Sequence, residues 1–288
     1  MGNKNAGAFR AKKRLGQNFL KSGTLIEEII DGSGIGPEDL VIEIGPGMGA
    51  LTEAAAKKAG KVIAVEIDSD LIPVLETKFA LTENVKIVEG DILETDVAGM
   101  IEEELAQSAD AAGSRTLTGA RIIGNLPYYI TTPIIMKLLE EDIPAKSITI
   151  MMQKEVAERI EAAPGGKDYG ALTIAVGYHC TVSEIADAPA ECFHPRPKVD
   201  SRVLQLTLRE EKAASPIDEK MFFDCVRAGF SQRRKTLANC LAPLAGGNKA
   251  EASRLLGQAG VDPSRRAETL SMEEFAKVSD SFAVRSSR

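Results

Sequence analysis

The first half of the chain alternates short β-rich runs with longer helix-patterned segments. Five of the runs are predicted to be buried strands, namely residues 40–44, 61–66, 85–90, 121–125 and 147–152. Between them, segments 49–60 and 70–82 carry the spacing of helices, with Asp70 as the expected cap of the second and Pro73 in its first turn. This alternation predicts an α/β fold with a mostly parallel, doubly wound sheet. Two later apolar runs, 171–178 and 202–208, are predicted to add strands.

The character of the sequence changes near residue 210. A charged, small-residue stretch containing a proline is typical of a linker. Beyond it, apolar residues recur at helical spacing, and further helices are predicted over 250–260 and 271–284. We therefore expect a basic N-terminal arm (1–21), an α/β domain (22–209) and a small all-helical domain (210–288). The small, polar segment 106–119 is predicted to be a mobile surface loop.

Composition excludes several classes of protein. The chain has two histidines and four cysteines, and none of the cysteines are spaced as C-x-x-C, so neither a zinc site nor a Ser–His hydrolase is expected. Free thiols in a reducing compartment are predicted instead. No apolar run approaches the ~20 residues that span a bilayer, and the basic N-terminus lacks the apolar stretch of a secretory signal. We expect a cytoplasmic protein, and nothing in the sequence demands more than a monomer.

Basic residues cluster although the net charge is −7. Residues 1–21 hold six Lys or Arg and no acid, and residues 227–235 hold four more and no acid. Within the second stretch, Arg233, Arg234 and Lys235 are predicted to lie in a helical segment and to grip RNA phosphate. The alternative for each stretch is a solvated surface.

Three glycines, Gly45, Gly47 and Gly49, separate the first predicted strand from the first predicted helix. Glycine allows a sharp turn and a close approach of the backbone to a ligand. The turn also fits G-x-G-x-x-G/A, and Glu66 follows where a dinucleotide fold places its ribose-binding acid. At this point a nicotinamide or flavin enzyme, an S-adenosylmethionine enzyme and a turn that serves packing alone all remain open.

Three acids favour S-adenosylmethionine. Glu43 completes E-x-G-x-G-x-G, which resembles the first motif of methyltransferases, and its carboxylate could face a cationic ligand. Glu66, at the end of the second strand, can accept hydrogen bonds from both ribose hydroxyls. Asp91, after the third strand, can accept a hydrogen bond from the adenine amino group. The alternative is that Asp91 only caps the next helix. All three positions fall at carboxyl ends of strands, where open α/β sheets bind ligands.

The fourth strand ends in Asn-Leu-Pro-Tyr, residues 125–128. Asn-Leu-Pro could simply end the strand, because proline donates no backbone hydrogen bond. The run also matches the [N/D]-[L/P]-P-[Y/F] pattern of amino-methyltransferases. The side-chain oxygen of Asn125 and a backbone carbonyl near Leu126 can accept the two hydrogens of an adenine 6-amino group. The lone pair of the amino nitrogen would then point at the methyl donor, and Tyr128 offers an aromatic face on which the adenine can stack. Positioning and preorganised dipoles would supply the rate.

Eight motifs in order resemble the ribosomal RNA adenine dimethyltransferase family, and within it the bacterial housekeeping branch that modifies small-subunit (16S) RNA. They are residues 15–20, 43–52, 65–68, 90–93, 124–134, 151–160, 193–201 and 229–237. The resemblance covers nearly the whole chain and implies a Rossmann-like S-adenosylmethionine methyltransferase domain. The stretch between Asp91 and Asn125 is long for the family, because of the 106–119 segment, which we interpret as a surface insertion.

The resemblance also implies roles for individual residues. Asn18 and Leu20 would close over S-adenosylmethionine, and Gly45 and Gly47 would pass under its methionine part. Glu66 would hold the ribose of the cofactor, and Asp91 would hold its adenine. Asn125 would contact both the cofactor and the target adenine. Phe193 and Tyr128 would sandwich the flipped adenine.

The implied product is N6,N6-dimethyladenosine at two adjacent adenosines in the 3′-terminal hairpin loop of 16S rRNA. The implied substrate is the assembling 30S subunit. Two alternatives to this enzyme remain: a binding role in ribosome assembly with methylation secondary, and a nicotinamide oxidoreductase based on the glycine-rich turn.

Overall fold

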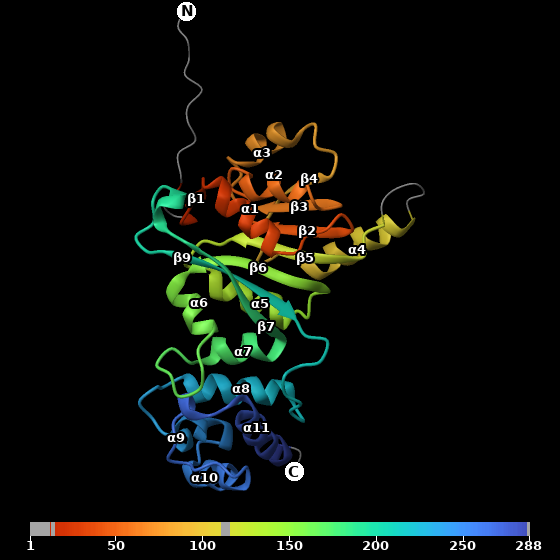
Figure 1. The fold of residues 1–288 in the computed structure, drawn as a ribbon. Coiled ribbons are helices and arrows are strands. Elements are labelled where there is room, and N and C mark those ends of the chain that lie inside the picture. The colour runs from red at the N-terminus through yellow and green to blue at the C-terminus, as the bar shows by residue number, and fades with distance from the viewer. Residues whose placement is uncertain (1–11, 13–14, 111–115, 287–288) are drawn as a thin grey trace, which may run out of the picture. The chain divides into compact units, whose positions relative to one another are not determined.

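A computed structural model describes residues 12, 15–110 and 116–286. Its main sheet has the strand order β4-β3-β2-β5-β6-β9-β7 (Figure 1). The strands are β2 (Asp39–Ile44), β3 (Lys61–Glu66), β4 (Val85–Glu89), β5 (Gly119–Asn125), β6 (Ala145–Gln153), β7 (Cys180–Ala188) and β9 (Ser201–Leu208). A separate two-stranded antiparallel sheet pairs β1 (Phe19–Leu20) with β8 (Phe193–His194). The five strands predicted in the first half of the chain are all present.

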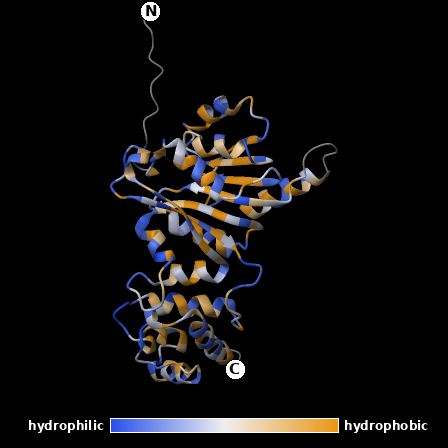
Figure 2. Ribbon diagram, in the orientation of Figure 1, coloured by the Kyte–Doolittle hydropathy of each residue, from blue (hydrophilic) through white to orange (hydrophobic). Residues whose placement is uncertain are grey.

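Parallel pairing brings the functional ends of the central strands together. Ile44 at the end of β2 lies opposite Val65 of β3 on one side and Gly124 of β5 on the other. Strand β3 pairs with β4 so that Glu66 lies opposite Glu89. Figure 2 shows apolar residues concentrated along these central strands, as expected where helices cover a parallel sheet. The carboxyl ends of β2, β3, β4 and β5 therefore share one edge.

Helices follow most of the strands. In the part of the chain with the sheet they are α1 (Gly23–Gly32), α2 (Ala50–Ala56), α3 (Ile72–Phe79), α4 (Val97–Asp110), α5 (Thr131–Glu140), α6 (Lys154–Ile160) and α7 (Ala171–His179), with a 3₁₀ turn η2 (Ala190–Cys192). Helix α1 shows why they form. Ser22 accepts a hydrogen bond from the Leu25 N–H as its N-cap, and Leu25, Ile29 and Ile30 make one buried face.

The later helices form a second core. They are α8 (Glu219–Phe230), α9 (Leu237–Leu241), α10 (Lys249–Gln258) and α11 (Met272–Ser286), with 3₁₀ turns η3 (Ala242–Ala245) and η4 (Ala267–Thr269). Phe222 of α8 stacks on Tyr178 at a ring distance of 5.1 Å, and Phe230 stacks on Phe275 at 5.8 Å. Leu255 and Phe282 are buried in the same core. The helices predicted over 250–260 and 271–284 are thus present, and the helical spacing of apolar residues just after the linker corresponds to α8.

Two compact units divide the described chain. Unit 1 comprises the described residues up to Lys154 together with Ser183–Gln205, and unit 2 comprises Glu155–Val182 with the described residues from Leu206 onward. The helices predicted after residue 210 fall within unit 2. The division into an arm, an α/β domain and a helical domain at residues 21 and 209 stays a prediction.

Three local predictions were wrong. Residues 171–178 form helix α7 instead of a strand, and the strand of this region is β7, just after it. Nearly every side chain of α7 is buried, so the run shows no polar alternation, and apolar length alone cannot separate a buried helix from a strand. Residues 106–110 of the predicted loop belong to α4, while 111–115 lie outside the described residues.

The third correction concerns Asp70. The N-cap position of α3 is Leu71, with Pro73 in the first turn, and no side chain caps the helix. Asp70 instead forms an ion pair with Lys12.

Cys180, Cys192, Cys225 and Cys240 are free thiols, as predicted. Within the described ranges, no helix combines the length and apolar character needed to cross a bilayer.

Candidate active site

A cavity opens at the carboxyl edge of β2, β3, β4 and β5, within unit 1. Its walls come from the arm segment (residues 15–20), the glycine-rich turn (43–48), the ends of β3 and β4, and the turn after β5. All of the predicted catalytic and cofactor-binding residues except Phe193 line it, namely Asn18, Leu20, Gly45, Gly47, Glu66, Asp91, Asn125, Leu126 and Tyr128. Segments more than a hundred residues apart in sequence therefore converge where parallel strands end.

The glycine-rich turn is shaped by its positive φ angles. Gly47 has φ 58° and donates its N–H to Glu66 Oε2 at 3.0 Å. A Cβ at this position would lie 2.9 Å from Cδ1 of Phe19, so only glycine lets the arm segment close onto the turn. Gly45 has φ 67°, and a Cβ there would meet nothing within 4 Å. At Gly45 it is the backbone conformation that requires glycine.

Glu66 is held by backbone donors on both oxygens. Besides the bond from Gly47, its Oε1 accepts from the Asp68 N–H at 2.9 Å. Burial raises the pKa of Glu66, and these two backbone bonds oppose the rise. The carboxylate is thereby fixed in orientation at the end of β3, facing the cavity.

Glu43 is a buried carboxyl beside the cavity with an unmet hydrogen-bonding need. The residue is 1% exposed, and neither Glu43 Oε2 nor Thr52 Oγ1 has a hydrogen-bond partner among the described residues. Burial raises the pKa of Glu43 to about 7. The Thr52 hydroxyl lies close enough to oppose that rise, although the pair lacks hydrogen-bond geometry. An orphaned acid at this place fits a site for a ligand that carries positive charge.

Asp91 does not cap the next helix, because α4 begins only at Val97. Its Oδ1 accepts from the Leu93 N–H at 2.9 Å and so stabilises the turn directly after β4. It also lines the cavity. Its Oδ2 accepts no hydrogen bond from the described residues and remains available to a donor on a ligand.

Asn125 is oriented by the arm segment. Its Nδ2 donates to the backbone carbonyl of Asn18 at 2.9 Å, and Asn18 Nδ2 in turn donates to the Gly16 carbonyl at 3.1 Å. Since the amide nitrogen is engaged, the oxygen Oδ1 is the group that Asn125 offers to the cavity as an acceptor. Leu126 follows, buried, with its N–H donated to the Met151 carbonyl at 3.3 Å.

Tyr128 and Phe193 occupy different environments. The Tyr128 hydroxyl is 2.8 Å from Ser201 Oγ, and burial raises the pKa of this phenol. The bond fixes the ring in the cavity wall, while burial keeps the phenol neutral. Phe193 is 2% exposed, pairs with Leu20 between β8 and β1, and belongs to the apolar core of unit 1. The structure does not bring it into the cavity, so its predicted stacking role requires the ring to leave this core.

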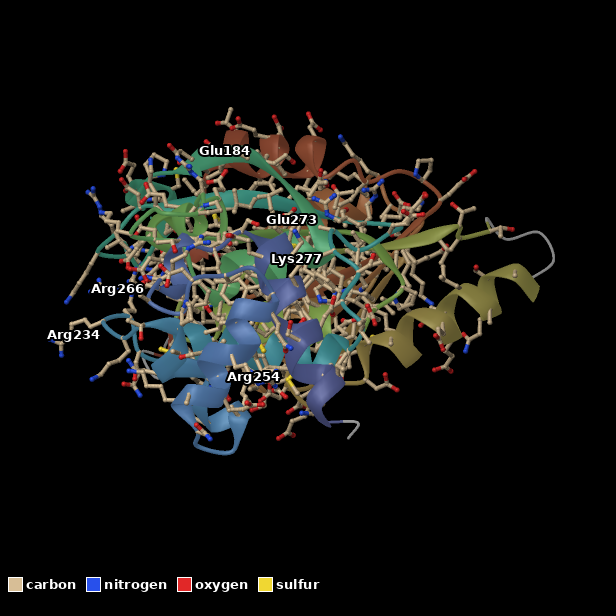
Figure 3. All side chains as sticks on the ribbon, turned by 90° about the horizontal axis from the view of Figure 1, so that it is seen from below. Glu184, Arg234, Arg254, Arg266, Glu273 and Lys277 are labelled. Atoms are coloured by element: carbon tan, nitrogen blue, oxygen red, sulfur yellow. The ribbon has the colours of Figure 1, made fainter. Side chains whose placement is uncertain are left out.

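The basic residues of unit 2 lie in a turn. Arg233, Arg234 and Lys235 are exposed between α8 and α9, so the prediction that they are helical was wrong. Figure 3 shows Arg234 projecting outward from the protein edge. Arg233 donates to the Lys167 backbone carbonyl. Of the basic residues predicted in the N-terminal arm, Lys4, Arg10, Lys13 and Arg14 lie outside the described residues.

Sequence reasoning missed four residues around the site. Lys12, Gln17 and Asp68 form a polar cluster next to Glu66, and Ser201 holds Tyr128. Gln17, Asp68 and Ser201 were inside motifs that the sequence analysis quoted. What the motifs lacked was any sign of which residues contact one another.

Comparisons with known proteins point to one family. The family model described as "Ribosomal RNA adenine dimethylase" matches residues 8–283. The "Ribosomal RNA small subunit methyltransferase A" of Shouchella clausii (strain KSM-K16) is 48% identical over 276 residues, covering 95% of this chain and 90% of that protein. The protein of the same name from Geobacillus thermodenitrificans (strain NG80-2) is 46% identical over 277 residues, covering 95% and 92%.

Among solved structures, a dimethyladenosine transferase from Plasmodium falciparum superposes with a TM-score of 0.73 at 27% identity, covering 90% of this chain and 95% of the other. The 23S rRNA methyltransferase ErmE superposes with a TM-score of 0.64 at 23% identity, covering 92% and 100%, and shares the fold.

Proposed function

Because the chain belongs to the ribosomal RNA adenine dimethylase family, we propose that it dimethylates two adjacent adenosines in the 3′-terminal hairpin loop of 16S rRNA. It is an S-adenosylmethionine-dependent rRNA adenine dimethyltransferase, as its family is. The nicotinamide alternative is thereby excluded. The observation that carries the proposal is the oriented carboxamide of Asn125 in a cavity that also holds the glycine-rich turn and three acids.

The residues of the cavity fit S-adenosylmethionine. We assign Glu66 to the ribose hydroxyls and Asp91, through its available Oδ2, to the adenine. Gly45 and Gly47 would pass under the methionine part, with the orphaned Glu43 carboxyl nearby as a match for positive charge. Asn18 and Leu20 would cover the ligand from the arm segment. Bound S-adenosylmethionine supplies an electrophilic methyl group on a sulfonium sulfur.

The chain's own contribution to the chemistry is to position a weak nucleophile. The 6-amino lone pair of adenine is delocalised into the ring. Asn125 Oδ1 and the backbone carbonyl of Leu126 accept the two amino hydrogens, which favours a pyramidal nitrogen with its lone pair directed away from both acceptors. Since Asn125 is already fixed by Asn18, no reorganisation is needed as the reaction proceeds. Removing one preorganised hydrogen-bonding group from an active site costs about 10²–10³ in kcat where the group is an oxyanion-hole donor, and we expect a loss of that order here.

The target adenine must leave its RNA stack to reach this cavity. Tyr128, whose hydroxyl is tied to Ser201, presents a fixed aromatic face on which the base can stack. Stacking of one base on one aromatic ring contributes about 1–3 kcal/mol. Phe193 would add a second face if its ring left the core.

The substrate is the assembling 30S subunit, with a role in its biogenesis. Arg233, Arg234 and Lys235 support this, because an exposed basic turn can contact RNA phosphates without reading sequence. We propose that the protein acts as a monomer. We also place it in the cytoplasm, where the small subunit of the bacterial relatives is assembled.

The direct test is methyl transfer from labelled S-adenosylmethionine to 30S subunits from cells that lack this modification. Mass spectrometry of the 16S rRNA 3′ fragment should find two N6,N6-dimethyladenosines. Asn125→Ala should lower kcat by about 10²-fold or more with S-adenosylhomocysteine binding retained. Label appearing elsewhere in the rRNA, or an active Asn125→Ala protein, would overturn the proposal.

The exposed basic turn also supports a second candidate, a binding role in subunit assembly with methylation secondary. In that case Asn125→Ala should still rescue subunit maturation in a deletion strain. Loss of rescue by a variant that still binds subunits would exclude this candidate.

A further inference from the structure

Lys12 joins the N-terminal arm to the loop after β3. Its ammonium contacts Asp68 Oδ1 at 2.5 Å and Asp70 Oδ2 at 2.6 Å. Gln17 adds a second connection, since its Nε2 donates to Asp68 Oδ2 at 2.7 Å. Gln17 Oε1 also accepts from the Lys12 N–H at 2.7 Å, so the two arm residues brace each other. Both oxygens of Asp68 are thus paired with groups from the arm.

Asp68 depends on these partners because it is buried. Its side chain is 1% exposed, whereas that of Lys12 is 24% exposed. Burial alone would raise the pKa of Asp68, but the bonds from Lys12 and Gln17 outweigh it and lower the pKa. With the arm open, the Asp68 carboxylate would lose its bonds to Lys12 and Gln17 and would retain only a bond from the Asp70 N–H. Hydrogen bonds to a charged group are stronger than neutral ones, so this pairing favours the closed arm.

The same loop carries the carboxylate assigned to the ribose. The Asp68 N–H donates to Glu66 Oε1, and Glu66 Oε2 accepts from Gly47. The arm's anchor is therefore two residues from Glu66 and shares its hydrogen-bond network. Moving Asp68 would disturb the orientation of Glu66.

Between its anchors the arm segment (residues 15–20) forms one wall of the cavity. Lys12 and Gln17 fix it to the β3–α3 loop. At Asn18 it is fixed to Asn125 at the end of β5, and Phe19 covers Gly47. The segment thus bridges the two sides of the cofactor cavity.

We propose that Lys12 and Gln17 are positioning residues that act through Asp68 to hold the arm segment closed over the cofactor, and so set its residence time. The proposal rests on the assignment of this cavity to S-adenosylmethionine. A cofactor enclosed by residues 15–20 leaves when the segment opens, and opening breaks the bonds to Asp68. Loss of the Lys12 cation lowers the population of the closed state.

The test measures the dissociation rate constant of S-adenosylhomocysteine by stopped-flow displacement from the full-length protein, without RNA. Lys12→Met should raise the rate about three- to tenfold, because it removes a charge-assisted bond to a buried acid. Lys12→Arg keeps the cation and should restore a rate near wild type. Lys21→Met removes the same charge from the exposed end of the arm, where Lys21 has no side-chain partner among the described residues, and should change nothing.

Two further readouts separate positioning from a loss of folding. The thermal midpoint of Lys12→Met should match wild type, because Lys12 lies outside the apolar cores. Asp70→Asn removes the 64%-exposed partner only and should raise the rate about twofold. In methyl transfer, the KM for S-adenosylmethionine should rise with kcat little changed.

A dissociation rate for Lys12→Met equal to that of Lys21→Met would overturn the proposal, as would failure of Lys12→Arg to restore the rate. If wild-type protein fails to bind S-adenosylhomocysteine, the assignment of the cavity to S-adenosylmethionine is wrong. The two failures are therefore distinguishable in one experiment.

Discussion

Asn125 marks what a sequence can and cannot predict about a single residue. Its type, its place at a strand end and the Pro-Tyr that follows led to its predicted role, and the structure places it in the cavity. Its orientation depends on the Asn18 carbonyl, 107 residues earlier in the chain, and on an arm segment whose contacts no local pattern encodes. The pairing of Asp68 with Lys12 is hidden for the same reason.

Glu43 carries a prediction about pH. Its pKa of about 7 in the folded protein lies above the ordinary value of 4.5, so the folded state binds a proton that the unfolded state releases. Its stability contribution is therefore lost as pH rises from about 4.5 to 7 and stays lost above that. Relative to Glu43→Gln, the free energy of unfolding of the wild type should fall by about 2–3 kcal/mol between pH 5 and pH 8.

Denaturant unfolding of both proteins without ligand at the two pH values measures this difference. A difference that does not change with pH would mean that Glu43 ionises in the folded protein as it does in the unfolded chain, and that burial does not raise its pKa.

At the scale of elements, the glycine-rich turn predicts a contrast between two glycines. Gly49 has φ 72°, and a Cβ there would lie 2.7 Å from Cε2 of Phe79 in α3. Gly49→Ala should therefore destabilise the protein by about 1–3 kcal/mol. Gly257, exposed in α10 with open space around it, is the control: Gly257→Ala should be neutral or stabilising by up to about 1 kcal/mol. Equal thermal shifts for the two variants would contradict the account of the turn.

Strand β8 carries the prediction for Phe193. The buried ring should make Phe193→Leu lose about 1–2 kcal/mol of stability, as measured by denaturant unfolding. The KM for 30S subunits should change by less than about twofold if packing is the role of the ring. A rise of about tenfold or more in that KM would show instead that Phe193 stacks on the substrate base.

Elements differ in how well their sequences specify them. Strands β2, β3 and β5 are short apolar runs bounded by turn signals, and all three were predictable. The run 171–178 is just as apolar but forms α7, since burial on all sides removes the alternation that separates the two periods. The β1–β8 pair could not be predicted, because two-residue strands carry no periodic signal.

For the whole molecule, the doubly wound sheet and the late helices followed from alternation and spacing. The sequence did not predict that Glu155–Val182 belong to the same unit as the late helices, because the composition changes only near residue 210. The topology of the sheet brings the site residues together. Parallel strands have their carboxyl ends at one edge of the sheet, so residues from many motifs converge there.

The basic turn of unit 2 predicts how the whole protein binds its substrate. Replacing Arg233, Arg234 and Lys235 by Ala should weaken 30S binding and reduce the log–log salt slope by about two. Affinity for S-adenosylhomocysteine should not change, since that cavity lies in unit 1. Lys249→Ala, a single exposed charge in the same unit, is the control. An unchanged salt slope in the triple variant, measured by filter binding, would remove these residues from the RNA interface.

The role of Asn125 is tested most directly by an experimental structure of the protein on small-subunit RNA with S-adenosylhomocysteine. We predict the extruded adenine beside Tyr128, with its N6 about 3 Å from Asn125 Oδ1 and facing the cofactor sulfur. An Asn125 carboxamide directed away from the base, with N6 held by other groups, would contradict the mechanism.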